Sequence, residues 1–126
     1  MTHLDESTVL CLHRMLTRET GGNPGLRDKG LLDSALFSAF QTFGGAELYP
    51  TPEEKAARIG FSLIANHAFL DGNKRIGLLT MLTLLEMEGI SLSVSDKELV
   101  DITLSVAAGR ADYGQLLAFI ENHKHT

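Results

Sequence analysis

The 126-residue sequence contains a single cysteine, no tryptophan and only three prolines. One cysteine cannot form an intrachain disulfide or a cysteine-based metal framework, so a reducing cytosol is allowed. Cys11 lies between two leucines on a predicted helix, which predicts a buried thiol. A membrane-spanning run is also missing, because the apolar stretch 76–85 is short and is interrupted by two threonines. With no N-terminal signal pattern, we expect a cytoplasmic protein that does not enter a membrane.

Positive charge is scarce as well. Lysine and arginine number 11 against 16 aspartates and glutamates, a formal net charge of −5, and the only clustered cations are Lys74 and Arg75. This balance argues against binding along a phosphate backbone, so we expect no direct nucleic-acid binding, whereas a nucleotide needs only a local basic site. With 44% hydrophobic residues, the chain can bury one core but is too short for two, so residues 1–126 are expected to form a single domain.

Alternating strand patterns are absent beyond short stretches, and apolar residues instead recur at spacings of three and four. Helix-start signals precede four of these stretches, at Asp28, Thr51, Ser95 and Asp112. The longest irregular piece is 41–50. The sequence therefore predicts an all-α fold, a compact six-helix bundle with helices near residues 7–20, 28–40, 51–67, 73–89, 95–107 and 112–123.

The densest chemistry lies at residues 67–75, HAFLDGNKR, which combine a titratable base, a carboxylate, an amide and two cations. Gly72 stands where the chain must pass from a tight turn into a helix, so Asn73, Lys74 and Arg75 fall in the first turn of that helix. Free backbone N–H groups and the positive end of the helix dipole favour anions there. Each of the two cations at this place lowers the stability of the helix by a few tenths to about 1 kcal/mol. A bound polyphosphate would make the same cations stabilising.

Spacing and chemistry indicate a role for each of these side chains. His67 can end the preceding helix and face the anion site, and imidazole accepts a proton near pH 7, so His67 would be the base. Asp71 supplies one oxygen for Mg²⁺, which would arrive with the phosphates of the nucleotide. Asn73 can orient a phosphate oxygen or a metal-bound water. Lys74 is a point charge, and Arg75 is a two-pronged donor for phosphate.

Each feature also has a plainer interpretation when it is taken alone. A histidine at a helix end is more often a cap than a catalyst, because imidazolium complements the negative end of the dipole. Asp71 followed by Gly72 is an ordinary turn, and Lys74 and Arg75 are ordinary solvated charges. Only the combination favours catalysis. Phe69 is expected to anchor the loop in the core under either interpretation.

The same residues carry a resemblance to a known family. The Fic signature is H-P-F-x-[DE]-G-N-G-R-x-x-R, and here it stands as HAFLDGNKRIGL. Lys74 replaces the glycine between Asn and Arg, and Leu78 replaces the second arginine; both departures are typical of the death-on-curing (Doc) branch of the Fic/Doc superfamily, which this sequence resembles. The resemblance also covers GGNPGLRDKGLLDSALFSAF and TFGGAELYPTPEEKAARIGFSLIANH, and within the motif it includes His67, Phe69, Asp71, Gly72, Asn73 and Arg75.

This resemblance implies a Fic/Doc-type bundle with a short flap between the second and third helices. In that fold the flap holds an acceptor segment of the target protein over the active site by strand addition. The alternative is simple loop anchoring by the aromatic and apolar residues around two glycines. The residues expected to contact the target are Phe43, Gly44, Gly45, Ala46, Glu47 and Leu48.

The resemblance further implies ATP and Mg²⁺ as cofactors. In Fic adenylyltransferases the motif glycine leaves room for the α- and β-phosphates, so AMP is transferred. A lysine at position 74 changes volume and charge, and Doc-like proteins bind ATP with the opposite polarity, so that its γ-phosphate meets the hydroxyl deprotonated by His67. The family target is a threonine of elongation factor Tu, so the chain is expected to be a growth-arresting kinase toxin of a type II toxin–antitoxin system.

Restraint of such a toxin is expected from an antitoxin supplied in trans, whose C-terminal segment would fold onto an apolar groove. Self-inhibition needs an [ST]-x-x-x-E-[GN] helix; Glu121 is the nearest match, but Leu117 stands where Ser or Thr is expected, and Leu78 removes the partner arginine. A Fic-type protein adenylyltransferase and an inert binding module stay open as alternatives. The intact motif argues against the inert module.

Overall fold

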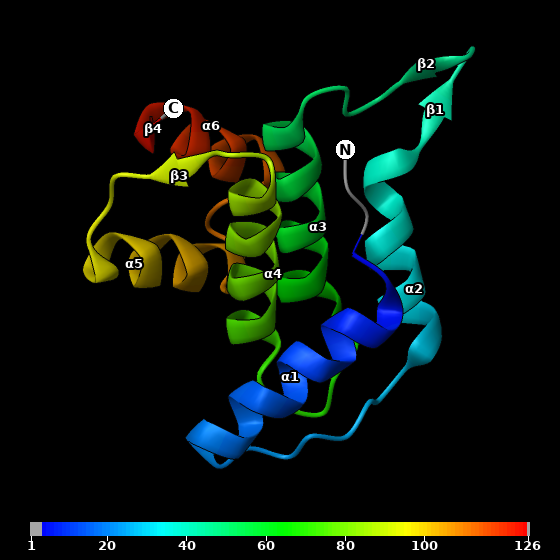
Figure 1. Cartoon of the computed structure of the whole chain (residues 1–126), viewed down its shortest axis with the longest axis vertical. Coiled ribbons are helices and arrows are strands. Elements are labelled where there is room, and N and C mark those ends of the chain that lie inside the picture. The colour runs from blue at the N-terminus through cyan, green and yellow to red at the C-terminus, as the bar shows by residue number, and fades with distance from the viewer. Residues whose placement is uncertain (1–3, 126) are drawn as a thin grey trace.

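The computed structural model describes residues 4–125, and over this range it contains six α-helices and two pairs of short antiparallel strands (Figure 1). The predicted all-α bundle is thereby confirmed. No helix within residues 4–125 has both the length and the apolar character needed to cross a membrane. A 3₁₀ turn, Ser38–Phe40, continues the second helix. The helices are α1 (Glu6–Thr20), α2 (Lys29–Phe37), α3 (Pro52–Asn66), α4 (Asn73–Met87), α5 (Asp96–Ala107) and α6 (Tyr113–His123).

Capping side chains account for where most helices begin. α4 differs, because its N-cap is Gly72, with a φ of 78°, and no side chain among residues 4–125 caps its first turn. α4 therefore starts with open backbone N–H groups. The four predicted caps are confirmed, since each accepts a hydrogen bond from a backbone N–H in the first turn: Asp28, Thr51, Ser95 and Asp112.

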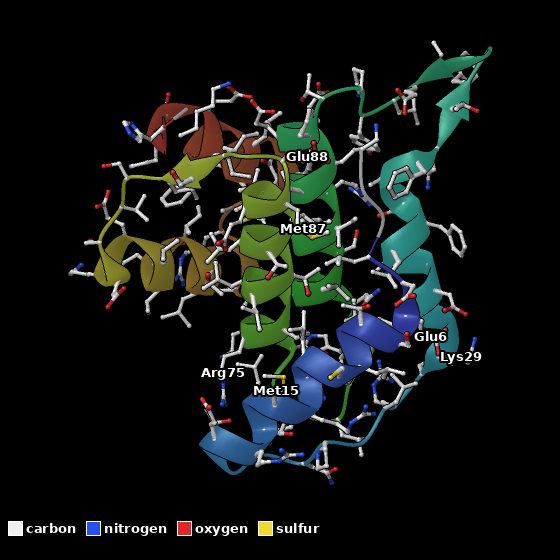
Figure 2. All side chains as sticks on the ribbon, in the orientation of Figure 1. Glu6, Met15, Lys29, Arg75, Met87 and Glu88 are labelled. Atoms are coloured by element: carbon white, nitrogen blue, oxygen red, sulfur yellow. The ribbon has the colours of Figure 1, made fainter. Side chains whose placement is uncertain are left out.

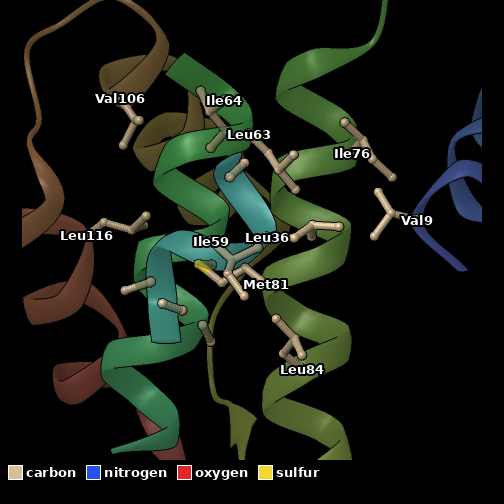
Figure 3. Close-up of a cluster of buried hydrophobic side chains, with 14 of the residues drawn as sticks. Val9, Leu36, Ile59, Leu63, Ile64, Ile76, Met81, Leu84, Val106 and Leu116 are labelled. Atoms are coloured by element: carbon tan, nitrogen blue, oxygen red, sulfur yellow. The ribbon is translucent and has the colours of Figure 1, made fainter. Parts of the chain in front are cut away.

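The antiparallel helices α3 and α4 lie side by side at the centre of the molecule (Figure 1). Their close approach requires glycine, because a Cβ at Gly77 would lie 2.5 Å from Cγ1 of Ile64 and one at Gly60 would lie 3.0 Å from Cβ of Met81. Buried side chains of both helices interlock around this contact (Figure 3). The end of α3 and the start of α4 consequently lie together, joined by residues 67–72.

The flap lies between α2 and α3, as predicted, and the structure forms it as a two-stranded hairpin. Strands β1 (Thr42–Phe43) and β2 (Ala46–Glu47) pair antiparallel, and the turn residues Gly44 and Gly45 have φ values of 60° and 83°. Positive φ at both positions suits a two-residue hairpin turn whose twist matches the strands. The hairpin projects from the bundle in Figure 1, and every residue from 41 to 48 is exposed.

A second strand pair was not predicted from the sequence. β3 (Ser91–Leu92) follows α4 and pairs antiparallel with β4 (Lys124–His125) near the end of the chain. Two-residue strands carry no periodicity, so nothing in the local sequence marks their pairing. The pair holds the C-terminal segment against the connection between α4 and α5.

The prediction of a buried Cys11 was wrong, because the structure leaves this residue exposed. α1 buries a single stripe at a spacing of four, Val9, His13 and Thr17. Cys11 lies away from that stripe on the helix. Leucine neighbours alone did not identify the buried face.

Candidate active site

A cleft of ≈ 420 Å³ opens where α3 ends and α4 begins. Figure 2 shows Arg75 at this end of α4, near α1, whereas Met87 and Glu88 mark its far end. Leu70 and, from α5, Ala107 complete the walls of this cleft, which we call the motif pocket. All the residues predicted for the base, the nucleotide and the metal line it: His67, Asp71, Gly72, Asn73, Lys74 and Arg75.

His67 ends α3 in an unusual backbone conformation. Its φ of 55° places it in the left-handed region, and it is the single non-glycine residue with positive φ among residues 4–125. This conformation costs an L-residue about 1–2 kcal/mol. Nε of Arg27 donates a hydrogen bond to the His67 carbonyl at 2.7 Å and so holds the turn in place. Strain retained at an exposed histidine in a pocket makes His67 a candidate functional residue.

Asn73 braces the loop from within. Its Nδ2 donates to the Phe69 carbonyl at 3.0 Å, and its Oδ1 accepts from the Phe69 backbone N–H at 3.0 Å. Phe69 is buried, as predicted, so this pair fixes the loop to the core. In the structure the Asn73 amide shapes the backbone that presents the other groups. Its role in orienting a phosphate or a metal-bound water stays a prediction.

His13 is a residue of the site that sequence reasoning missed. It is fully buried in α1, stacks on Phe69 with ring centroids 3.8 Å apart, and places Nε2 2.6 Å from the backbone carbonyl of Asp71. Because a carbonyl can only accept, Nε2 must donate this hydrogen bond. Nδ1 is buried without a hydrogen-bond partner among the described residues. A histidine on the apolar stripe of α1 was the available signal, since a buried polar side chain requires a partner.

The Asp71 carboxylate is exposed at the pocket. Its Oδ1 accepts the Gly72 N–H at 3.0 Å, its Oδ2 accepts the Asn23 N–H at 3.4 Å, and a Cβ at Gly22 would lie 2.9 Å from Oδ2. The α1–α2 loop thus closes against the carboxylate while both oxygens keep lone pairs for a cation. Residues 4–125 contain no group of three or more metal-ligating side chains. One carboxylate is compatible with Mg²⁺ that is otherwise held by phosphate oxygens and water, and the metal role of Asp71 stays a prediction.

Positive charge gathers opposite that carboxylate. Lys74 and Arg75 are exposed in the first turn of α4, and neither forms a salt bridge with any residue in the described range 4–125. The uncapped start of α4 adds its backbone N–H groups. Donors in this arrangement can bind an anion of several charges.

The structure does not bring the flap to this pocket. No residue from 43 to 48 lines the motif pocket. The flap precedes α3 and His67 follows it, so the helix, 15 residues or about 22 Å long, separates them. The contact of Phe43 to Leu48 with a segment of the target protein stays a prediction, and a target that reaches both the flap and the motif pocket would have to span the length of α3.

The base of the flap is nevertheless fixed. Lys55 of α3 is buried, and its Nζ donates to Oε1 of Glu47 at 2.9 Å and to the Tyr49 carbonyl. The hydrogen bond from Lys55, and then its charge, lower the pKa of Glu47 below its ordinary value. The Tyr49 ring packs edge-on against Tyr113 of α6, with centroids 5.3 Å apart. A buried cation and two aromatic rings thus hold an otherwise exposed hairpin.

Comparison with known proteins supports the assignment of the motif. Residues 3–85 match the model of the Fic/DOC family. The chain is 41% identical over 73 residues to "Toxin Doc" of Mycolicibacterium smegmatis, an alignment that covers 58% of this chain and 56% of that protein. It is 29% identical over 109 residues to "Protein kinase doc" of Escherichia phage P1, covering 86% of this chain and 85% of that protein. The matched region thus spans little more than half of the mycobacterial relative.

Proposed function

The chain belongs to the Fic/DOC family, in its Doc branch, and we propose that it is a toxin that transfers the γ-phosphate of ATP to a hydroxyl group of a translation factor. The observation that carries this proposal is the convergence of the motif residues on one pocket at the open start of α4. The printed names of the two relatives, a toxin and a protein kinase, agree with it. We propose elongation factor Tu as the first candidate substrate and the cytoplasm as the site of the reaction.

Phosphate binding is assigned to the first turn of α4. The open N–H groups beyond Gly72 and the cations Lys74 and Arg75 would face a bound anion, and neither cation has a competing ion pair within residues 4–125. Charge that develops on the transferred phosphoryl group would be stabilised by donors already in place. By the resemblance to Doc proteins, we assign to Lys74 the preference for γ-phosphate transfer over AMP transfer.

His67 is assigned as the general base. It would take the proton of the acceptor hydroxyl as that oxygen bonds to the γ-phosphorus, while the bond to the bridging oxygen breaks and ADP leaves with its electron pair. Its exposed position at the pocket edge suits a proton donor that arrives on another protein. Asp71 would hold Mg²⁺, which supplies charge neutralisation to the phosphates when bound. His13 and Asn73 keep Asp71 and the α4 N-terminus in position.

Restraint by an antitoxin in trans is the second part of the proposal. Glu121, the candidate for self-inhibition, forms an ion pair with Lys124 at 2.9 Å, and Lys124 also reaches Glu53 at 2.7 Å. Glu53 lies at the start of α3, whereas His67 follows its end. This network lies far from the motif pocket, which favours inhibition by a separate protein.

The proposal is tested by incubating the purified protein with elongation factor Tu, ATP and Mg²⁺ and weighing the target by mass spectrometry. An added phosphoryl group is expected. An added AMP would instead support the alternative of a protein adenylyltransferase. An unmodified target would support the alternative of an inert binding module. Transfer of label from ATP labelled at the α- or γ-phosphate gives the same distinction. The variant Lys74→Gly tests whether this lysine sets the polarity of the bound ATP, and it should lose transfer of the γ label.

A further inference from the structure

A second hollow opens on α1, near the motif pocket. It measures ≈ 210 Å³ and is lined by Arg14, Thr17 and Arg18 of α1 and by Gly22 and Pro24 of the α1–α2 loop. We call it the α1 hollow. Among residues 4–125, no carboxylate lines it, and both of its arginines are exposed. It is therefore a positively charged site on a chain whose formal net charge is −5.

Contacts between α1 and the motif loop place the α1 hollow next to the Asp71 carboxylate. A Cβ at Gly22, in the wall of the α1 hollow, would lie 2.9 Å from Oδ2 of Asp71, which lines the motif pocket. Cγ2 of Thr17, another wall residue, would lie 3.9 Å from a Cβ at Gly72. The Asp71 side chain therefore lies between a wall of the α1 hollow and the motif pocket.

The stability of α1 does not account for both arginines. Arg18 lies in the last turn, where a cation complements the helix dipole. Arg14 lies one turn earlier, and like charges at this spacing destabilise a helix by about 0.2–0.5 kcal/mol. Neither arginine forms a salt bridge within residues 4–125. A guanidinium group binds a carboxylate through two parallel N–H donors, so the hollow is suited to a ligand with two carboxylates.

We propose that the α1 hollow binds a pair of acidic side chains in the protein substrate, on the same segment as its acceptor hydroxyl. This inference rests on the proposed function, and it deepens it by giving the protein substrate a recognition element. Arg14 and Arg18 are separated by about 6 Å along the helix axis. Alternate residues of an extended segment are about 6.6 Å apart and point to the same side. The matching substrate sequence is therefore acidic–x–acidic in an extended conformation.

The charge of the chain favours a protein over a nucleic acid as the occupant. A single strand carries a phosphate about every 3.4 Å, and binding along it takes a continuous row of cations. The α1 hollow offers two cations, and the net charge of −5 repels a polyanion beyond them. A short acidic segment needs no more than these two arginines.

The direct test uses a fluorescent peptide, Glu-Thr-Glu-Thr-Glu, and its uncharged counterpart Gln-Thr-Gln-Thr-Gln. Binding to the full chain is followed by fluorescence anisotropy at low salt. Wild type should bind the acidic peptide about tenfold more tightly than the neutral one. The double variant Arg14→Gln/Arg18→Gln should remove this preference, since glutamine keeps helix propensity but carries no charge. Added salt should weaken the preference in wild type.

The matched control is Arg110→Gln. Arg110 is also exposed and has no salt bridge within the described range, but it lies in the connection between α5 and α6. This variant should keep the full preference for the acidic peptide.

Three results would overturn the proposal. The first is equal binding of the two peptides by wild type. The second is a preference that survives in the double variant, and its loss in Lys74→Gln would then place the peptide at the motif pocket. The third is an oligouridylate RNA that binds through Arg14 and Arg18 more tightly than the acidic peptide, which would assign the α1 hollow to a nucleic acid.

Failure of the proposed function has a different signature, because the peptide test involves no phosphoryl transfer. With elongation factor Tu as substrate, the double variant should raise the KM for the protein by about tenfold and leave kcat and the KM for ATP unchanged. If wild type prefers the acidic peptide but does not phosphorylate elongation factor Tu, the α1 hollow stands and the proposed reaction is wrong. If wild type and the double variant phosphorylate it with the same KM, the reaction stands and the proposed recognition element is wrong.

Discussion

The two ends of α3 hold functional segments in opposite ways. At the C-terminal end, residues 67–72 are braced by the buried rings of His13 and Phe69 and by the partly buried Asn73 amide. At the N-terminal end, the flap is exposed from 41 to 48 and is fixed only at its base, where Lys55 reaches Glu47.

This difference follows from what each segment has to do. Phosphoryl transfer requires the base, the cations and the phosphate to keep a fixed geometry, since small displacements cost large factors in rate. A surface for a partner protein gains from exposed backbone edges and adaptable side chains. We therefore expect changes beneath the motif loop to affect kcat and changes beneath the flap to affect KM for the protein substrate.

The largest effect is expected at the end of α3 itself. His67→Ala removes the base and should lower the rate of target phosphorylation by about 10²–10⁴-fold. The side chain is exposed, so the midpoint of thermal unfolding should change little. His125→Ala, at another exposed histidine, is the control. A near wild-type rate in His67→Ala would show that another group is the base.

The next effect is expected beneath the motif loop. His13→Phe keeps the aromatic stack on Phe69 but removes the hydrogen bond to the Asp71 carbonyl, and should lower kcat by about 10–100-fold. Stability should change by only about 1 kcal/mol, since the orphaned Nδ1 disappears along with the hydrogen bond. Both are measured together, by initial rates and by urea unfolding. A loss of stability with unchanged kcat would make His13 purely structural.

Lys55→Met tests the other end of the helix. Removing the cation frees Glu47 and the Tyr49 carbonyl, so the flap should lose order and KM for the protein target should rise about fivefold, which is about 1 kcal/mol. The KM for ATP and kcat should stay unchanged. Lys29→Met removes another ion-paired lysine, with partners Glu6 and Asp33, and serves as control. Should kcat fall instead, the two ends of α3 would be coupled.

A smaller effect isolates the backbone strain at the motif. His67→Gly and His67→Ala both remove the imidazole, but only alanine retains the penalty of a left-handed conformation. The glycine variant should be more stable than the alanine variant by about 1 kcal/mol. Chemical denaturation of the pair measures this directly. Equal stabilities would mean that the loop relaxes when the imidazole is lost.

The smallest effect is a pH dependence confined to the flap. The hydrogen bond from Lys55 lowers the pKa of Glu47, so the ion pair is fully present above the ordinary value of 4.5 and is lost as the pH falls through the lowered value. The Leu48 N–H, bonded to the Gln41 carbonyl at 3.0 Å, reports on it. Its exchange protection should hold to pH 4.5 and fall below it, and Lys55→Met should abolish this transition.

Much of the fold was predictable because the signals are local. Caps at Asp28, Thr51, Ser95 and Asp112 act within one turn, so helix starts could be predicted to within a residue or two. The motif is local too, since residues 67–75 are consecutive and their placement follows from one turn and one helix start. The predicted burial of Phe69 was confirmed for the same reason.

What the sequence analysis missed depends on contacts between distant segments. Cys11 was assigned to the wrong face because only the packing of α1 shows which stripe is buried. His13 supports Asp71 across 58 positions of sequence, and no spacing rule connects them. The contact of the flap with a target protein stays a prediction; the structure adds that the length of α3 separates the flap from the motif pocket.

The sequence by itself determined the helices, their caps and the set of chemical groups at residues 67–75, because hydrogen bonds within a turn depend on neighbours a few positions away. Only the tertiary structure decided what surrounds those groups. The contact of α3 with α4 through Gly60 and Gly77 closes the loop, α1 brings His13 beneath it, and α5 contributes Ala107 to the wall of the motif pocket. These neighbours come from segments far apart in the chain, and packing a shared core is what brings them together.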